Sequence, residues 1–354
     1  MSAPVEIVSL DTPSLGDRSY VAHDGRHAIV VDPQRDTDRV LDVVGRHDLH
    51  VTHVLETHVH NDYVTGGYAL ARTLGAAYVL SADDEVGFDR LGVRDGDVLA
   101  AGPRLRVRVL HTPGHTFTHL SYALQADGEA VAVFTGGSLL YGSTGRPDLL
   151  GAAHTEALAR AQHASARRLA AELPADTALY PTHGFGSFCA ATRSDRTSST
   201  IAAEARDNPA LTQDEERFVD TLLAGLDAYP AYYAHVGPVN AAGPAPADLS
   251  PPRPADPAQL RRRIAAGEWV VDLRSRTAFA AGHLPGTVSL GLDGSFVTYL
   301  GWLMPWGTPV TLLGETPEDV AAAQRDLARI GIDRPAAAAT GKPEDWAGGD
   351  VLGG

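Results

Sequence analysis

The chain has 354 residues, of which 44% are hydrophobic and 21% are charged, enough apolar material for two or three domains of about 100–200 residues each. The formal net charge of −15 excludes nucleic acid as a partner, because phosphate binding needs a surplus of basic residues on one face. The single cysteine excludes an intramolecular disulfide and a cysteine-based zinc site.

No segment carries a signal for export or for insertion into a membrane. Residues 1–10 contain no basic stretch followed by an apolar run, and no apolar stretch approaches the length needed to cross a bilayer. We therefore expect a cytoplasmic protein without a membrane partner, with a homodimer as the candidate assembly.

The first part of the chain alternates short strands, tight turns and helices, which predicts an α/β fold. Strands are expected where β-branched and apolar residues run between turn residues, and helices where apolar residues recur at helical spacing. The expected strands cover residues 20–23, 28–31, 51–56, 76–81, 105–110, 119–124, 130–134 and 177–180. The expected helices cover residues 37–46, 64–74, 155–172 and 213–226.

A stretch rich in proline and alanine marks a domain boundary at residues 241–256, where it predicts a semi-rigid linker. We therefore expect a metal-binding domain over residues 1–240 and a smaller α/β domain over residues 257–354. The expected strands of the smaller domain cover residues 269–273, 287–290 and 310–313, and its expected helices cover residues 257–266 and 317–330.

A histidine-rich motif directly follows the strand expected at residues 51–56. His58, His60 and Asp62 lie at every second position, and extended backbone sends alternate side chains to the same side. The three side chains are therefore expected to converge at the carboxyl end of that strand. Imidazole and carboxylate are ligands that suit zinc or iron.

Two further histidines follow other expected strands. His115 ends the segment His-Thr-Pro-Gly-His after residues 105–110, and His183 lies in Pro-Thr-His-Gly after residues 177–180. Proline and glycine permit the tight turns that direct a side chain inward. A single histidine of this kind is more often a surface residue or a hydrogen-bonded core residue, but these histidines together, at the ends of several expected strands, predict a metal site. His119 is close enough in sequence to His115 to support the ligands of that site.

These segments resemble the metallo-β-lactamase superfamily over about residues 5–235. The matching segments are 57–63, 111–116, 134–138, 145–149 and 181–186. The persulfide dioxygenases are the branch most resembled, through Gly-Arg-Pro-Asp-Leu at 145–149, and the glyoxalase II thioesterases are near relatives. The resemblance implies an αββα sandwich that holds one divalent metal, Fe(II) or Zn(II). The candidate ligands, taken from their positions at strand ends, are His58, His60, Asp62, His115 and His183, and the resemblance points to His58 and His115 among them.

Two positions depart from the family pattern. Tyr63 stands where the superfamily motif has a histidine, which weakens a second metal position and is compatible with the mononuclear branch. Gly137 stands where the persulfide dioxygenases have an aspartate ligand, so the resemblance leaves His58 and His115 without that carboxylate. A site of His58, His60 and His115, or one that includes Asp62, remains open. We expect water or Asp62 to fill the gap beside Gly137.

The same resemblance suggests roles for single residues. Asp62 and Tyr63 are the candidate catalytic residues, and Arg146 is the candidate substrate-binding residue. An internal ion pair between Arg146 and Asp148 that braces the site is the alternative. No residues are assigned to a cofactor other than the metal.

Residues 257–335 resemble a rhodanese, through Val-Asp-Leu-Arg at 271–274 and Phe-Ala-Ala-Gly-His-Leu-Pro-Gly at 279–286. Rhodanese chemistry needs a cysteine nucleophile in the loop after the central strand. The matching loop, residues 314–318, contains no cysteine, and Glu315 and Glu318 would oppose a persulfide anion. We therefore predict that this domain has no sulfurtransferase activity.

Three functions remain open. The favoured one is oxidation of a low-molecular-weight thiol persulfide to sulfite and thiol at a mononuclear metal. The alternative is a zinc-dependent thioester hydrolase that resembles hydroxyacylglutathione hydrolase. The third is a degenerate metal site used for binding only, because two functional positions are lost. The expected partner is a small thiol-derived substrate.

Overall fold

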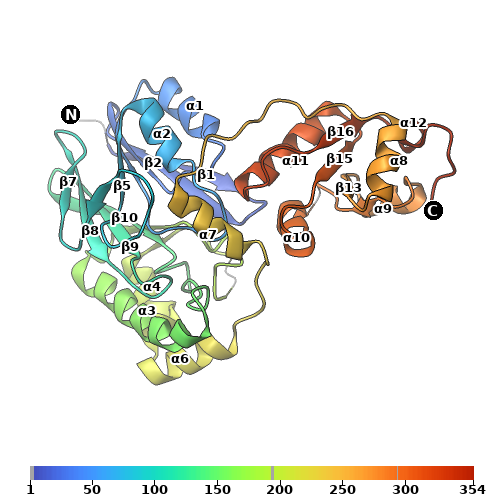
Figure 1. Cartoon of the computed structure of the whole chain (residues 1–354). Helices are drawn as coiled ribbons and strands as arrows, with labels where there is room; N and C mark the ends of the chain where they lie inside the picture. Colours follow the sequence, from blue (N-terminus) through green and yellow to red (C-terminus); the bar gives the residue numbers. More distant parts are fainter. Residues whose placement is uncertain (1–3, 193–194, 293) are drawn as a thin grey trace. The chain divides into compact units, whose positions relative to one another are not determined.

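The computed structural model describes residues 4–192, 195–292 and 294–354 (Figure 1). The chain divides into two compact units, the first made of residues up to 229 with 237–245, and the second of 230–236 with 246–354. None of the described helices is long and apolar enough to cross a membrane.

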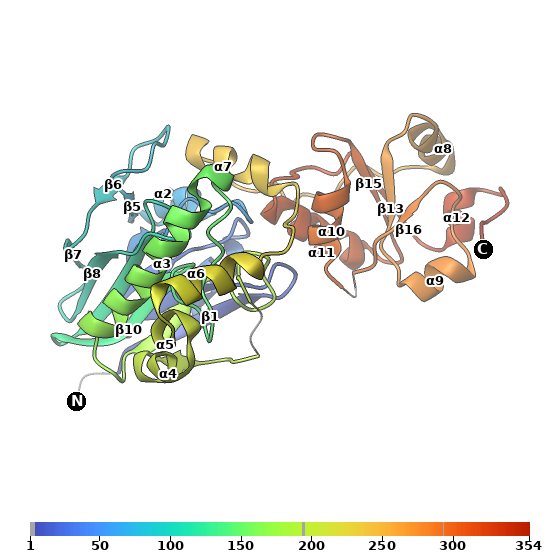
Figure 2. The same cartoon turned by 90° about the horizontal axis from the view of Figure 1, so that it is seen from below.

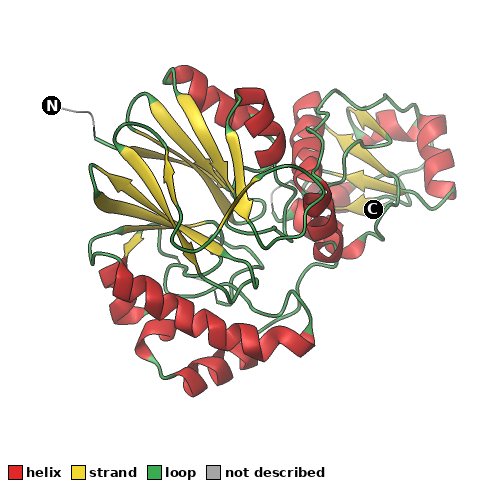
Figure 3. Ribbon diagram, turned by 60° about the vertical axis from the view of Figure 1, so that its left-hand side comes forward, coloured by secondary structure: helices red, strands yellow, loops and turns green. Residues whose placement is uncertain are grey.

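Two six-stranded mixed sheets form the centre of the first unit (Figure 3). The strands of the first sheet, in sheet order, are β1 (Glu6–Thr12), β2 (Asp17–His23), β3 (His27–Val31), β4 (His50–Leu55), β5 (Ala77–Ser81) and β6 (Leu91–Val93). Those of the second sheet are β12 (Ser199–Thr200), β11 (Ala178–Pro181), β10 (Glu129–Gly136), β9 (Leu120–Ala126), β8 (Leu105–His111) and β7 (Val98–Ala100).

The two sheets pack face to face, and helices cover their outer faces. Ile29 and Leu55 of the first sheet share one buried core with Val107 and Phe134 of the second. The helices α1 (Asp38–Arg46) and α2 (Gly67–Leu74) pack on the first sheet. The helices α3 (Ala152–Glu172), α4 (Ile201–Asp207), α5 (Pro209–Thr212) and α6 (Glu215–Ala224) lie on the second (Figure 2). This arrangement confirms the αββα sandwich expected from the sequence.

Helix α2 begins three residues later than the sequence predicts. The hydroxyl of Thr65 accepts a hydrogen bond from the backbone N–H of Gly67 (2.8 Å), and the N–H of Thr65 donates to the side chain of Asn240 (2.9 Å). These bonds, together with the isolated antiparallel bridge between Thr65 and Gln34, hold residues 64–66 outside the helix, so the helix starts only at Gly67. The sequence also missed the short strands β6, β7 and β12, and the longer edge strand β1.

The second unit contains a four-stranded parallel sheet. Its strands, in sheet order, are β14 (Val288–Ser289), β13 (Trp269–Asp272), β15 (Val310–Gly314) and β16 (Ala337–Thr340). Its helices are α8 (Pro257–Ala265), α9 (Arg276–Ala281), α10 (Phe296–Leu303), α11 (Pro317–Arg329) and α12 (Pro343–Ala347). Helix α7 (Tyr233–Ala242) is divided between the two units. The resemblance of this unit to a rhodanese stays a prediction.

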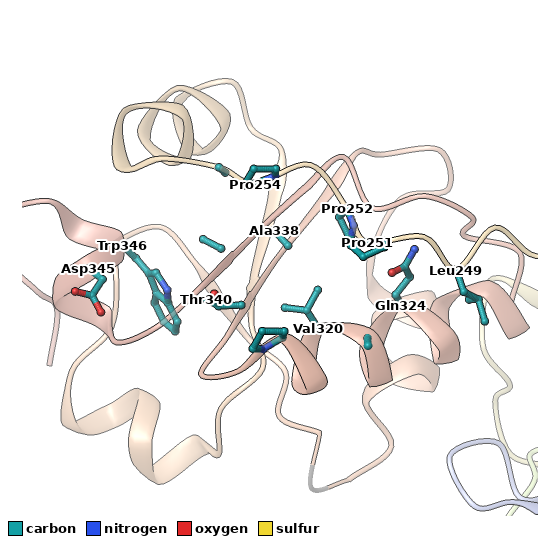
Figure 4. Close-up of a pocket in the computed structure, with 14 residues that line it drawn as sticks. Leu249, Pro251, Pro252, Pro254, Val320, Gln324, Ala338, Thr340, Asp345 and Trp346 are labelled. Atoms are coloured by element: carbon teal, nitrogen blue, oxygen red, sulfur yellow. The ribbon is translucent and has the colours of Figure 1, made fainter.

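Part of the expected linker is an ordered wall of the second unit. Ala338 of β16 exchanges backbone hydrogen bonds of 2.8 Å with Arg253 and Ala255, so this segment extends the sheet beyond β16. A cavity of about 450 Å³ lies between residues 249–255 and α11, with Trp346 near one end and Leu249 near the other (Figure 4).

Candidate metal centre

The five side chains predicted to bind metal lie together at one end of the sandwich. His58, His60 and Asp62 follow β4, His115 follows β8, and His183 follows β11. Each is at most 1% exposed. The ring centroid of His58 lies 4.0 Å from that of His60, 4.8 Å from that of His115 and 5.4 Å from that of His183.

Three of these imidazoles present nitrogen atoms to a common point. The ligand nitrogens of His58, His115 and His183 all lie within 4.8 Å of one another, and the Nε2 atoms of His58 and His183 are 3.4 Å apart. A tetrahedral zinc site with bonds of about 2.1 Å separates neighbouring ligand atoms by about 3.4 Å. The spacing therefore fits a single divalent ion.

A relay of hydrogen bonds sets the tautomer of His58. The Thr57 hydroxyl donates to the Asp32 carboxylate (2.8 Å), so its oxygen can only accept from Nδ1 of His58 (2.9 Å). Burial opposes ionisation of Asp32, but the neighbouring His60 lowers its pKa, so the carboxylate is charged. The proton of His58 is thus held on Nδ1, and the lone pair of Nε2 faces the centre.

His115 and His183 are oriented in the same way. Nδ1 of His115 lies 2.8 Å from the backbone oxygen of Arg146, which can only accept. Nδ1 of His183 lies 2.9 Å from Oδ1 of Asp17. Both rings therefore carry a proton on Nδ1 and direct Nε2 inward, as metal-binding histidines do.

The pKa values of these two histidines differ because their surroundings differ. Burial lowers the pKa of His115 to about 3, so its ring is neutral. Burial also acts to lower the pKa of His183, but the carboxylates of Asp62 and Asp17 outweigh it and raise that pKa to about 10. A metal bound by His183 would replace the proton on its Nε2.

His60 is turned differently from the other three histidines. Its Nε2 lies 3.3 Å from carboxylate oxygens of Asp32 and Glu56 and 2.9 Å from the Tyr63 hydroxyl. Burial opposes protonation, but these carboxylates raise the pKa of His60 to about 9. Only Nδ1, which lies 3.9 Å from Asp62 and has no hydrogen-bond partner, remains to bind a metal. Its ligand role stays a prediction.

The two candidate catalytic residues are both buried and engaged. The Tyr63 hydroxyl accepts from Nε2 of His60 and donates to the backbone oxygen of Asp32 (3.2 Å), and burial raises the pKa of Tyr63 well above its usual value. Burial acts to raise the pKa of Asp62, but His183, 3.2 Å away, holds it below its usual range. Tyr63 is thus a neutral phenol beside a charged carboxylate.

The ring of His115 occupies the space beside Gly137. A Cβ atom on Gly137 would lie 2.3 Å from Cδ2 of His115, and one on Gly145 would lie 2.7 Å from its Nδ1. The N–H of Gly145 donates to the backbone oxygen of Gly137 (2.8 Å), and the imidazole packs closely against both glycines of this pair. The expectation that water or Asp62 fills the missing ligand position stays a prediction. His119 helps to hold this backbone in place, because its Nε2 accepts a hydrogen bond from the N–H of Gly137 (3.0 Å).

The guanidinium of Arg146 is fully occupied within the protein. It binds the carboxylate of Asp148 through two nitrogens (2.7 and 2.8 Å) and donates to the backbone oxygens of Phe188 (3.2 Å) and Asp227 (2.6 Å). It also lies 4.7 Å from the centre of the Tyr229 ring. This geometry favours the bracing alternative, whereas direct contact with substrate stays untested.

The sequence reasoning missed several residues that position the ligands. Asp32 follows the strand expected at 28–31, so the rule used for the histidines would have found it. Asp17 is the first residue of β2, not a residue that follows a strand, and it carries no such signal. Asn240 donates to the backbone oxygens of His60 (2.8 Å) and Tyr63 (2.9 Å) from a segment expected only to end the domain.

Comparison with known proteins agrees with this geometry. The family model of the Metallo-beta-lactamase superfamily matches residues 18–183. A hydroxyacylglutathione hydrolase of Polaromonas is 32% identical over 45% of this chain and 57% of its own length. The human mitochondrial persulfide dioxygenase ETHE1 is 30% identical over 58% of this chain and 72% of its own length. The chain thus spans little more than half of the hydrolase and nearly three quarters of the dioxygenase.

A solved structure resembles the whole chain. The crystal structure of a metallo-beta-lactamase from Staphylococcus aureus is 27% identical, covers 96% of this chain and 99% of its own, and superposes with a TM-score of 0.84. The chain therefore belongs to the metallo-β-lactamase superfamily.

Proposed function

We propose that this protein is a mononuclear metal enzyme that oxidises a low-molecular-weight thiol persulfide with dioxygen. The reaction RSSH + O₂ + H₂O → RSH + SO₃²⁻ + 2H⁺ oxidises the outer sulfur to sulfite and returns the inner one as a thiol. The relation to a persulfide dioxygenase supports this proposal, as does the centre built around His58, His115 and His183.

The observation that carries the one-metal proposal is the state of Tyr63. Its hydroxyl is hydrogen-bonded on both sides, its ring stacks on His60 with centroids 4.3 Å apart, and its pKa is raised by burial. A neutral phenol held in this way is a poor replacement for the imidazole that a second metal would need. A single ion held by the three histidines is therefore the simpler centre.

The protein's own part in this chemistry is to position groups and hold protons. Asp17, the Asp32–Thr57 relay and the backbone oxygen of Arg146 keep the three Nδ1 protons in place, which leaves each Nε2 free to bind a metal at the common point. A divalent metal at this point supplies a Lewis acid and, when it is iron, redox chemistry.

A zinc-dependent thioester hydrolase is the second candidate. Three imidazoles without a carboxylate ligand resemble the catalytic zinc sites that lower the pKa of bound water. The relation to hydroxyacylglutathione hydrolases favours this alternative. The centre would then need only the three histidines and a solvent position.

We expect the Fe(II)-loaded protein to consume oxygen when glutathione persulfide is added and to form sulfite in equal amount. An oxygen electrode combined with sulfite analysis measures both quantities, and the zinc-loaded protein serves as the matched control. Hydrolysis of a glutathione thioester by the zinc form, with no oxygen uptake by the iron form, would replace the proposal with the hydrolase. Inactivity of both forms would support a site used for binding only.

We also expect no sulfurtransferase activity from the second unit. The loop between β15 and α11 contains no cysteine, and the Thr316 side chain there is used to cap α11 by bonding to the N–H of Asp319 (3.2 Å). The measurement is thiocyanate formation from thiosulfate and cyanide by the full-length protein. Thiocyanate formation that persists in Cys189→Ser would contradict this prediction. Cys189 lies in the first unit and is the single cysteine of the sequence, so this variant has no cysteine left to carry the sulfur.

A further inference from the structure

A second cluster of metal-ligating side chains lies outside the buried centre, where β1, β2 and α1 meet. Glu6 and His23 are directly opposite each other in the antiparallel pair β1–β2, which places their side chains together on one face. His47 caps the C-terminus of α1, and its ring centroid lies 5.1 Å from that of His23. The ligand atoms of all three residues lie within 4.8 Å of one another.

The histidine at the middle of this cluster has an unsatisfied nitrogen. His23 is only 3% exposed, and its buried Nε2 has no hydrogen-bond partner, since the Glu6 carboxylate lies 3.8 Å away. Burial lowers the pKa of His23, so the ring is neutral near pH 7. Glu6 and His47 are exposed and can turn toward Nε2 without disturbing the core. The buried His23 ring is thus fixed in place, whereas the exposed side chains of Glu6 and His47 can adjust around the same point.

We propose that Glu6, His23 and His47 form a second, surface zinc site that ties the β1–β2 hairpin to the end of α1. Two imidazoles and one carboxylate, with water in the fourth position, are ligands that zinc accepts in tetrahedral geometry. The site lies at the C-terminal end of a helix, where the helix dipole favours a cation. The three ligands come from three different elements of the first unit.

Binding at this site requires one local change. Nδ1 of His23 accepts a long hydrogen bond from the N–H of Gly25 (3.2 Å), which places the proton of the neutral ring on Nε2. Zinc on Nε2 moves the proton to Nδ1, so the Gly25 bond breaks and the exposed Gly25 amide turns to solvent. This change is a signature of the site, because no ligand of the buried centre touches Gly25 in the described structure.

The test is a zinc titration of the full-length protein, with zinc content measured after removal of loosely bound ions. We expect His47→Ala and Glu6→Gln each to bind one zinc ion fewer than the wild type, because both changes remove an exposed ligand. His50→Ala removes another exposed histidine nearby and is expected to retain the wild-type zinc content. These variants leave the buried centre intact, so their enzymatic activity should be unchanged.

Nuclear magnetic resonance adds a second measurement. Zinc should shift the Gly25 amide signal and the His23 ring signals in the wild type and in His50→Ala, but not in His47→Ala. Equal zinc content in the wild type and His47→Ala would overturn the proposal, as would an unshifted Gly25 amide at saturating zinc. Neither result bears on the proposed oxidation, because that reaction uses the other metal centre.

Discussion

Replacing His115 with alanine is expected to abolish stoichiometric metal binding. Nε2 of His115 is one of three nitrogens that face the centre, and its orientation is set by the backbone oxygen of Arg146. Loss of a group that only orients a ligand weakens metal binding by about 10–100-fold, so loss of the ligand itself costs more. The measurement is metal content after expression in medium supplied with iron and zinc.

His154→Ala is the control for this change, because His154 is exposed and lies outside the centre. The same measurement separates the two possible sets of ligands. The geometry predicts that His183→Ala also loses the metal, whereas His60→Gln, which keeps a hydrogen-bond donor for Asp32 and Glu56, retains it. If His60→Gln loses the metal and His183→Ala retains it, the ligands are instead His58, His60 and His115. Unchanged metal in His115→Ala would refute both sets.

Replacing Gly137 with aspartate is expected to destabilise the protein in the absence of metal. The new Cβ would lie 2.3 Å from the ring of His115, which also packs closely against Gly145. Overfilling a packed site costs about 1–3 kcal/mol, and burying a carboxylate adds to that cost. Gly137→Ala is the matched control, because it adds the same Cβ without the charge.

Thermal unfolding with and without Fe(II) tells the steric and ligand effects apart. We expect both variants to melt below the wild type without metal, and only the aspartate variant to regain stability when iron is added. That recovery would mean that His115 has moved and that the new carboxylate binds the ion, as the family pattern implies. An aspartate variant as stable as the wild type without metal would contradict the close packing of His115 against Gly137.

The sequence predicted which residues meet but not how each one is turned. His58, His115 and His183 could be placed together because strands of a sheet end at a common edge, and each follows a strand. The orientation of His60 could not be predicted, because it depends on Asp32 and Glu56. Two carboxylates on separate segments have no spacing that identifies them as partners of one imidazole.

The surroundings of Gly137 also could not be predicted from the sequence. From the sequence, a missing aspartate leaves an empty ligand position, and water or a nearby carboxylate is the natural occupant. In the structure the ring of His115 lies where the Cβ of such an aspartate would be, and a second glycine, Gly145, leaves room for the same ring. The fit of the His115 ring against Gly137 and Gly145 depends on segments that are separate in the sequence, so no local sequence pattern predicts it.

The carboxylate of Asp32 also determines when the centre can form as the chain folds. It accepts hydrogen bonds from Thr57, 25 residues away just after β4 of the first sheet, and from the Thr182 hydroxyl, 150 residues away just after β11 of the second sheet. Contacts between such distant residues form late, because closing a long loop costs entropy. We therefore expect the metal centre to be completed only after the two sheets have docked. An ion would then enter a scaffold that is already built, unlike the zinc of a small finger domain, which nucleates its own fold.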